Sequence, residues 1–159
     1  MIKYIEMDNI NLIYNHSFSC PDLLEFNLSG SKSISQRVLI INYLNNNHSK
    51  IINLSNSEDA CVLINALTSD ERVINLKQSG TALRFLITLF SYEKRNVVLE
   101  GDSSLLKRPI SRLINALNLL GANIETNNHK IIIHESNLIG GKIYLNKINT
   151  SQFISSLLL

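Results

Sequence analysis

The segment Asn27–Leu44 reads NLSGSKSISQRVLIINYL, a polar, glycine-containing start that leads into an almost wholly apolar run. The first turn of a helix presents unpaired N–H groups and a partial positive charge, which favour phosphate or carboxylate. Ser33 and Arg37 are four residues apart and share one helix face, and Lys32 and Gln36 share the neighbouring edge. A guanidinium binds such oxygens in pairs, whereas a lysine acts as a point charge. The segment therefore predicts a helix whose start can bind an anion.

The apolar part of this helix indicates where it lies in the fold. We expect Ile34, Val38 and Ile41 to form the stripe that faces the core. Val38–Leu44 and a second run, Leu83–Phe90, are apolar nearly all round, which is typical of helices enclosed on all sides. The strand-like segments instead alternate apolar and polar residues, as in sheets with one exposed face. Helices inside and half-exposed sheets outside reverse the usual α/β layering.

Composition narrows the class of protein. The 159 residues are 45% hydrophobic and 18% charged, which is typical of a globular domain. The net charge is +2 and no basic run occurs, so we expect no nucleic-acid or membrane partner. Cys20 and Cys61 lie far apart and the four histidines form no ligand pattern, so we expect neither a disulfide nor a metal site. We expect a cytoplasmic protein, because the N-terminus lacks the apolar core of a signal peptide and no apolar run is long enough to span a membrane.

Strand-like and helix-like segments alternate along the chain, which predicts an α/β or interleaved α+β fold. The expected strands are Lys3–Glu6, Asn9–Tyr14, Leu23–Leu28, Ile51–Leu54, Val73–Leu76, Val97–Glu100, Asn123–Thr126, Lys130–His134 and Lys142–Leu145. The expected helices are Ser33–Leu44, Ser57–Leu67, Gly80–Phe90, Pro109–Leu119 and one from Ser151 onward. Pro109 suits the first turn of its helix, and Gly121 suits the position just after the end.

A short repeat organises these helices. The pentapeptide LINAL occurs at Leu63–Leu67 and again at Leu113–Leu117, each time late in an expected helix. Polar-start helices alternate with these LINAL helices, which indicates a repeated supersecondary unit of roughly 50 residues. The final segment Ser151–Leu159, SQFISSLLL, has no C-cap and is too short for a helix that is stable alone. We therefore expect the chain to be a fragment that ends inside a helix.

Two further helix starts repeat the polar pattern. Lys77–Phe85, KQSGTALRF, places Gly80 and Thr81 at a start where the bare backbone would let a ligand approach closely. Asn149–Ile154, NTSQFI, places two hydroxyls and an amide at the third start. Taken singly, such starts are more often helix caps, and early cations are more often solvated. As a set, they predict three helix starts that converge on one anion-binding site, without indicating a reaction.

The same residues resemble the 5-enolpyruvylshikimate-3-phosphate synthase family. Leu28–Leu39, LSGSKSISQRVL, resembles the family motif LPGSKSxSNRALL, and Gly80–Phe85, GTALRF, resembles the end of its NAGTAMRF segment. Gly101–Gly121 is similar to GxxRMxxRPxxxLxxALxxLG, and Gly140–Leu158 is similar to GGxxxxxxxxSSQxxSALL. The motifs occur in the family order from Leu23 onward, and they match only the first part of a family enzyme.

This resemblance implies a transferase of the shikimate pathway, which leads to chorismate and the aromatic amino acids. The implied reaction moves the enolpyruvyl group of phosphoenolpyruvate to the 5-hydroxyl of shikimate 3-phosphate and releases phosphate. It implies no cofactor and no obligatory metal, and a monomeric full-length enzyme whose partners are these two small-molecule substrates. The family fold is an inside-out α/β barrel of βαβαββ repeats, with buried helices and half-exposed sheets. We expect residues 1–22 to belong to its other domain and residues 23–159 to form an incomplete N-terminal domain, which alone does not turn over substrate.

The resemblance also implies roles for individual residues. Lys32 is implied to contact both substrates and to be the catalytic cation. The residues implied for shikimate 3-phosphate are Lys32, Ser33, Arg37, Thr150, Ser151 and Gln152, and those implied for phosphoenolpyruvate are Lys32, Gly80 and Thr81. We expect preorganised donors of this kind to supply most of the catalysis, by stabilising developing charge.

Some positions depart from the family pattern. Ser104 stands where the family has an arginine that binds phosphoenolpyruvate, and loss of such a buried, bidentate contact costs about 2–5 kcal/mol. Lys107 is one candidate to replace that arginine, and Gln78 replaces the asparagine of NAGTA. Arg108 and Asp59 match family positions, and we expect both to be structural, as capping or surface charges.

Three alternatives stay open at the level of sequence. The sister enolpyruvyl transferase that acts on UDP-N-acetylglucosamine has Lys-Asn where this chain has Lys32-Ser33, and a reactive loop cysteine that neither Cys20 nor Cys61 matches. A decayed, non-catalytic relative would keep anion binding without turnover, and Ser104 favours it. An RNA-binding module is disfavoured, because the sequence offers neither a basic face nor an aromatic stacking platform.

Overall fold

The computed structural model of the protein describes residues 3–7, 10–14, 28–127, 130–144 and 150–159. Most of the expected helices and strands are confirmed, with ends within two residues of the expected ones. The observed elements are β1 Lys3–Met7, β2 Ile10–Tyr14, α1 Lys32–Leu44, α2 Glu58–Thr68, β3 Val73–Asn75, α3 Gly80–Tyr92, β4 Val97–Glu100, α4 Ser103–Leu106, α5 Ser111–Leu119, β5 Asn123–Asn127, β6 Lys130–His134 and α6 Ser151–Leu158.

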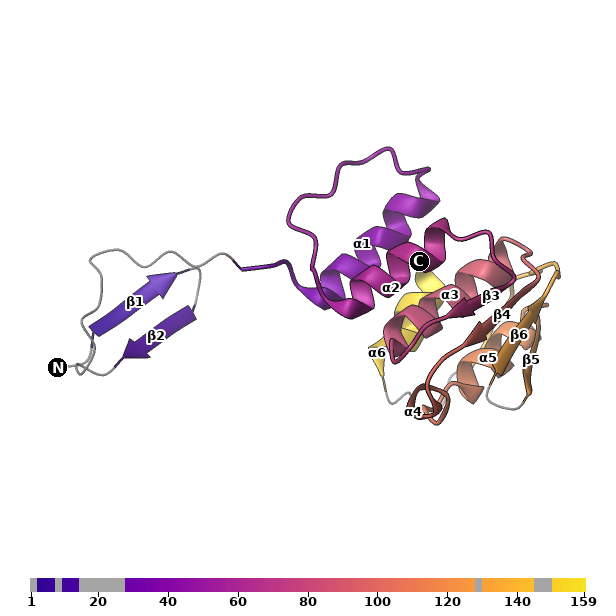
Figure 1. Ribbon diagram of the computed structural model, residues 1–159. Coiled ribbons are helices and arrows are strands. Elements are labelled where there is room, and N and C mark those ends of the chain that lie inside the picture. The colour runs from indigo at the N-terminus through magenta and orange to yellow at the C-terminus, as the bar shows by residue number, and fades with distance from the viewer. Residues whose placement is uncertain (1–2, 8–9, 15–27, 128–129, 145–149) are drawn as a thin grey trace.

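A four-stranded sheet in the order β3-β4-β6-β5 forms one side of the main body (Figure 1). β3 and β4 are parallel and are joined through α3, whereas β4 pairs with β6, and β6 with β5, in antiparallel fashion. Apart from the short α4, the order β3-α3-β4-α5-β5-β6 is one βαβαββ unit. The strands β1 and β2 form a separate antiparallel two-stranded sheet, in which Lys3 lies opposite Tyr14.

The helices gather on one side of the four-stranded sheet (Figure 1). α3 contacts β6 and also α1, α2, α5 and α6, so it lies at the centre of the helical layer. Its side chains Leu83, Leu86, Ile87 and Phe90 are completely buried, as expected for an enclosed helix. The strands β4 and β6 alternate buried and partly exposed residues, so one face of the sheet is covered and the other is not. The expected layering, with helices inside and half-exposed strands outside, is confirmed.

The two LINAL helices, α2 and α5, bury the same positions of the repeat. Each copy exposes its asparagine, Asn65 in α2 and Asn115 in α5. The buried equivalents are Leu63 and Leu113, Ala66 and Ala116, and Leu67 and Leu117. The repeat seen in the sequence therefore corresponds to a repeated packing role, in which one helix face presents leucine and alanine to the core.

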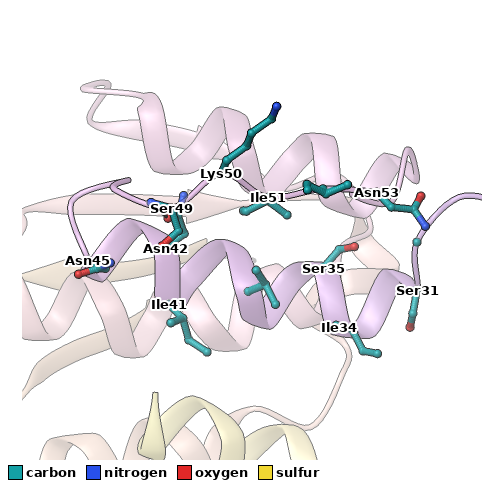
Figure 2. Close-up of a pocket in the computed structure, with 13 residues that line it drawn as sticks. Ser31, Ile34, Ser35, Ile41, Asn42, Asn45, Ser49, Lys50, Ile51 and Asn53 are labelled. Atoms are coloured by element: carbon teal, nitrogen blue, oxygen red, sulfur yellow. Dashed lines mark hydrogen bonds between the residues drawn. The ribbon is translucent and has the colours of Figure 1, made fainter.

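The expected core-facing stripe of α1 is wrong. Ile34 and Ile41 have 64% and 51% of their surface exposed, and Val38 is half-buried. These side chains line an open groove of about 470 Å³ together with residues 49–53, and Figure 2 shows Ile34 and Ile41 projecting from the same side of the helix. α1 contacts α2 and α3 through another face, which buries Ser35, Gln36, Leu39 and Ile40. Tertiary neighbours, rather than the most apolar stripe, decide which face is covered.

Two expected strands, Ile51–Leu54 and Lys142–Leu145, are not formed in the described residues, and a third, Leu23–Leu28, lies outside them except for Leu28. Residues 51–54 are irregular, and the chain on either side of them is bonded to α1: Ser49 N donates to Asn42 Oδ1 and Ser55 N donates to Ser35 Oγ. Residues 142–144 are also irregular, and Leu28 is not in a strand, while residues 23–27 and 145 lie outside the described part. α4 was not expected, and Pro109 precedes α5 rather than standing in its first turn. In the described part of the chain, no helix has the length and hydropathy needed to cross a bilayer.

The core assignment predicts opposite outcomes for two leucines of α5. Leu117 is 1% exposed and packs in the core, whereas Leu119 is 77% exposed. Leu117→Ala should reduce the free energy of unfolding by about 2–5 kcal/mol, because it removes buried methyl groups and leaves a cavity. The matched Leu119→Ala should change it by less than about 0.5 kcal/mol. Urea unfolding followed by circular dichroism measures both, and equal effects would contradict the packing of α5.

Candidate anion-binding site

A polar cavity of about 390 Å³ lies where residues of α1, α2, α3 and α6 meet. Most of its lining side chains can donate or accept hydrogen bonds. The lining residues are Lys32, Ser33, Gln36, Glu58, Asp59, Val62, Lys77, Gln78, Ser79, Gly80, Thr81, Arg108 and Gln152. The cavity is therefore lined by the first turns of all four helices.

Two of the helices that begin at this cavity, α1 and α3, have no side chain that caps their first turn. Ser31 and Ser79 stand at the N-cap positions without a side-chain hydrogen bond to the helix, and neither first turn contains an acidic residue. In contrast, the side chains of Ser57 and Thr150 cap α2 and α6. The first-turn N–H groups of α1 and α3 are thus left for another acceptor, and the helix dipole makes an anion the preferred one.

Lys32, the first residue of α1, forms an ion pair with Asp59 of α2. Its Nζ donates to Asp59 Oδ2 at 2.9 Å. Burial raises the pKa of Asp59, but the adjacent Ser79 hydroxyl, the Lys32 ammonium and the Arg108 guanidinium lower it by more, so this pKa lies below its ordinary value of 3.8. The carboxylate stays charged at neutral pH and holds the Lys32 ammonium at the cavity.

Gln152 of α6 connects its helix to the start of α3. Its Nε2 donates to Thr81 Oγ1 at 2.9 Å, and its Oε1 accepts from Arg84 Nη1 at 2.8 Å. Arg84 is 6% exposed and also donates to the Gly80 carbonyl oxygen at 2.9 Å, while its guanidinium stacks over the Phe153 ring. This network joins residues that are 68 and 71 positions apart in the sequence, and it fixes Gln152 beside the expected phosphoenolpyruvate residues.

Arg37 connects α1 to α6 on the neighbouring side. Its Nη1 donates to Ser33 Oγ at 2.6 Å and to the Ser33 carbonyl oxygen at 2.9 Å, as their four-residue spacing predicts. Its Nη2 donates to Ser155 Oγ at 3.2 Å, and its guanidinium lies over the Phe85 ring. The guanidinium is therefore positioned by both helices, next to a residue that lines the cavity.

Gln36 presents polar atoms to the cavity that the described residues do not satisfy. This side chain is 1% exposed and lines the cavity, yet neither Oε1 nor Nε2 has a hydrogen-bond partner within the described residues. A buried amide without partners costs stability unless something else satisfies it. A ligand or a water molecule in the cavity would supply the missing acceptor and donor.

The charges around the cavity do not balance. Lys32 pairs with Asp59, and Lys77 pairs with Glu58 at 2.7 Å, so two cations are offset by two carboxylates. Arg84 and Arg108 remain and form no ion pair within the described residues, although the charge of Arg108 also acts on Asp59. Burial first, and then the positive charge of Arg108, lower the pKa of Arg84. An anion is the complement that such a cavity lacks.

The structure brings together five of the eight predicted site residues. Lys32, Ser33, Gly80, Thr81 and Gln152 line one cavity, which supports the expected convergence of the three helix starts. Three others lie close to it without lining it. Arg37 reaches Ser33 and Ser155, Thr150 caps α6, and Ser151 is the exposed first residue of that helix.

Sequence reasoning missed several residues of the cavity. Asp59 and Arg108, which we expected to be purely structural, both line it. Gln36 was expected on the edge of α1 but not as a buried, unpartnered amide, and Arg84 was not identified as the partner of Gln152. A signal for Arg84 existed, because an arginine inside an otherwise apolar helix is rarely buried without a partner. For Arg108 the signal was its match to an arginine of the family pattern, which we had interpreted as structural.

These features define a class of protein: an α/β protein with enclosed helices whose starts line one polar cavity. Comparison with known proteins agrees. The model of the family "EPSP synthase (3-phosphoshikimate 1-carboxyvinyltransferase)" matches residues 62–159. A 3-phosphoshikimate 1-carboxyvinyltransferase of Bacteroides fragilis (strain YCH46) is 39% identical over 136 residues, which cover 83% of this chain and 33% of the relative. One of Buchnera aphidicola subsp. Schizaphis graminum (strain Sg) is 32% identical over 188 aligned positions, covering 100% of this chain and 42% of the relative.

The fold is also similar to solved structures. EPSP synthase from Acinetobacter baumannii superposes with a TM-score of 0.69 at 23% identity, over 84% of this chain and 37% of that chain. A second structure of the enzyme from that organism gives a TM-score of 0.67 at 24% identity. The chain belongs to the EPSP synthase family. It spans about a third of the length of the first curated relatives that it matches.

The ion pair at the cavity predicts a specific loss of stability in acid. Because the pKa of Asp59 is lowered by folding, its stabilising contribution is fully present above the ordinary value of 3.8 and is lost as pH falls below it. The unfolding free energy of Asp59→Asn should therefore fall less between pH 6 and about pH 2.5 than that of the unmodified protein. Urea unfolding at several pH values measures this, with the exposed Asp70→Asn as control. Parallel pH profiles for Asp59→Asn and the unmodified protein would contradict the account of this pair.

Proposed function

We propose that the natural polypeptide transfers the enolpyruvyl group of phosphoenolpyruvate to the 5-hydroxyl of shikimate 3-phosphate and releases phosphate. This chain would supply the first half of the active site. Family membership supports the reaction, and the unbalanced positive charge of the cavity suits two substrates that are both multiply charged anions. The relatives themselves are named for this activity.

One observation supports this function best: the contact of Gln152 with Thr81 and Arg84 at the cavity that also contains Lys32. Three motifs that are distant in the sequence meet at one polar cavity in this way. A cap or a solvated cation would not need that convergence.

The proposed reaction is an addition followed by an elimination. In the addition, the 5-hydroxyl oxygen bonds to C2 of phosphoenolpyruvate, the hydroxyl proton goes to a base, and C3 gains a proton. In the elimination, the bond from C2 to the phosphate oxygen breaks, phosphate leaves with the electron pair, and C3 loses a proton to restore the double bond. Fixed cations and N–H groups assist because charge develops on the phosphate as it leaves.

The residues of this chain divide into two groups in this proposal. Lys32 would contact both substrates and stabilise the leaving phosphate, and its pairing with Asp59 would hold the ammonium in position. Ser33, Arg37, Thr150, Ser151 and Gln152 would bind shikimate 3-phosphate. Gly80 and Thr81, at the uncapped start of α3, would bind phosphoenolpyruvate.

The remainder of the natural polypeptide would complete the site. The chain matches about a third of the relatives' length, and we expect the acid–base carboxylates and further cations to lie outside it. In this proposal residues 1–22 pack with the other domain, residues 23–159 form part of the first, and the enzyme is a cytoplasmic monomer. The sister transferase with a loop cysteine is not favoured, because the relatives are shikimate enzymes and Cys61 lies within α2.

Replacement of Lys32 tests the proposed function. In the natural polypeptide, Lys32→Ala should lower the rate of phosphate release by about 100-fold or more, the scale for loss of one electrostatic donor at a reacting centre. Lys50→Ala is a matched control, because Lys50 is an exposed lysine that lines the separate groove shown in Figure 2 and should leave the rate unchanged. A coupled phosphate-release assay with both substrates measures the rates.

Other outcomes of this experiment distinguish the alternatives. Binding of shikimate 3-phosphate without any phosphate release from the unmodified natural polypeptide would indicate a decayed relative. Turnover by the 159-residue chain alone would contradict the division of the site between this chain and the remainder.

A further inference from the structure

The groove on α1 exposes an apolar surface that the equivalent helix α3 keeps buried. Ile34, Val38 and Ile41 of α1 line one side of this groove, and residues 49–53 line the other (Figure 2). Ile34 and Ile41 are more than half exposed, and Ile52 is 80% exposed. α3 instead packs on the four-stranded sheet, where it contacts β6. Because burial of such apolar side chains is favourable, we expect another segment to cover the groove.

The part of the chain that contains α1 and α2, which we call the first unit, has no hairpin to serve as this cover. In the second unit, β3-α3-β4-α5-β5-β6, the LINAL helix α5 is followed by the hairpin β5-β6. After the LINAL helix α2, only residues 69–72 precede β3. The Buchnera relative that aligns with the whole chain takes 188 positions for these 159 residues, and a missing hairpin with its connections would account for the difference. The cover must therefore come from another segment.

The segment just before α1 has the pattern of a strand that fits this place. Residues 23–28 read LLEFNL, so Leu24, Phe26 and Leu28 alternate with polar residues. Alternate side chains of a strand point to the same face, so this pattern predicts one apolar face and one largely polar face. Six residues of strand extend about 20 Å, whereas the seven-residue interval from Ile34 to Ile41 rises about 10 Å. The segment is therefore long enough to cover the stripe on α1.

The second unit shows where such a segment pairs. β3 precedes α3 and pairs in parallel with β4, which follows α3. The contact continues beyond the two strands, where Asp102 N donates to the Lys77 carbonyl oxygen at 2.9 Å. The first unit has a similar approach: Gly30, just before α1, lies so close to Asn53 that a Cβ at position 30 would collide with the Asn53 carbonyl oxygen. The chain that precedes α1 thus already lies against the segment that follows α1, at one end of the groove.

One occupant would explain both features of this region that differ from expectation. Residues 51–54, IINL, have a strand-like sequence but pair with no strand in the described part of the chain. A strand forms only where another backbone accepts and donates its hydrogen bonds. The stripe of α1 lacks an apolar partner in the same groove. A strand in the groove would supply the backbone partner and the apolar partner together.

We propose that residues 23–28 form a strand that occupies this groove, parallel to residues 51–54 and with its apolar face against α1. The inference goes beyond the proposed function and does not depend on the reaction. The strand would end three or four residues before Lys32, so its binding in the groove would also hold the start of α1 in position at the polar cavity.

Hydrogen–deuterium exchange of the natural polypeptide tests this inference, with mass spectrometry of peptides that contain residues 51–54. Phe26→Asp should speed the exchange of these amides by about tenfold or more, because a carboxylate cannot be buried against the α1 stripe and the paired strand is lost. Glu25→Gln, on the polar face, is the matched control and should change the rate by less than about twofold. Slow exchange of the buried helix α3 in the same samples shows that each variant is folded. Phe26→Ala replaces Phe26→Asp if the latter does not fold.

Three outcomes would overturn the inference. If residues 51–54 exchange as fast in the unmodified protein as in Phe26→Asp, they are not paired. If they exchange slowly in both, a different segment of the polypeptide covers the groove. If the slow exchange appears only at concentrations at which light scattering detects a dimer, a second copy of the chain covers it.

Discussion

The rest of this structure depends on one constraint, the concentration of positive charge around a single polar cavity. The uncapped starts of α1 and α3 face one cavity, and Lys32, Lys77, Arg84 and Arg108 are close to it. Asp59 and Glu58, both in the first turn of α2, offset two of these cations. Arg84 and Arg108 form no ion pair in the described part of the chain, so an anionic ligand would balance the charge of the site.

This constraint explains the unusual layering. For several helix starts to point into one cavity, the helices must pack against one another, and the strands are then placed outside them. α3 occupies the centre and is buried over most of its length, while the sheet β3-β4-β6-β5 covers only one side of the helical layer. The hydrogen bonds of Gln152 and of Arg37 join α6 to α3 and to α1, so the same polar residues that shape the cavity also hold the helices together.

Much of this arrangement could be predicted from the sequence. Periodicity located the helices and most strands, and the two LINAL segments indicated a repeated unit, whose copies α2 and α5 bury equivalent residues. The convergence of Lys32, Gly80 and Gln152 followed from three similar helix starts. These inferences succeed because they depend on local patterns that are repeated.

The failures concern contacts between distant segments. The most apolar stripe of α1 was expected in the core, but its neighbours cover a different face and leave Ile34 and Ile41 exposed. Residues 51–54 look like a strand, yet Asn42 and Ser35 of α1 take the backbone hydrogen bonds around them. The place of Arg108 depends on how the turn after α4 packs on the start of α3, which no residue near Arg108 reveals. Tertiary packing overrides local preference in each case.

The convergence of the helix starts is tested most directly by an NMR titration of the natural polypeptide with shikimate 3-phosphate. The account predicts that the backbone amide signals of Lys32, Gly80 and Gln152 shift together and give one dissociation constant, while those of the groove residues Lys50 and Ile52 stay unchanged. Shifts confined to a single helix start, or different dissociation constants for the three starts, would contradict a common site.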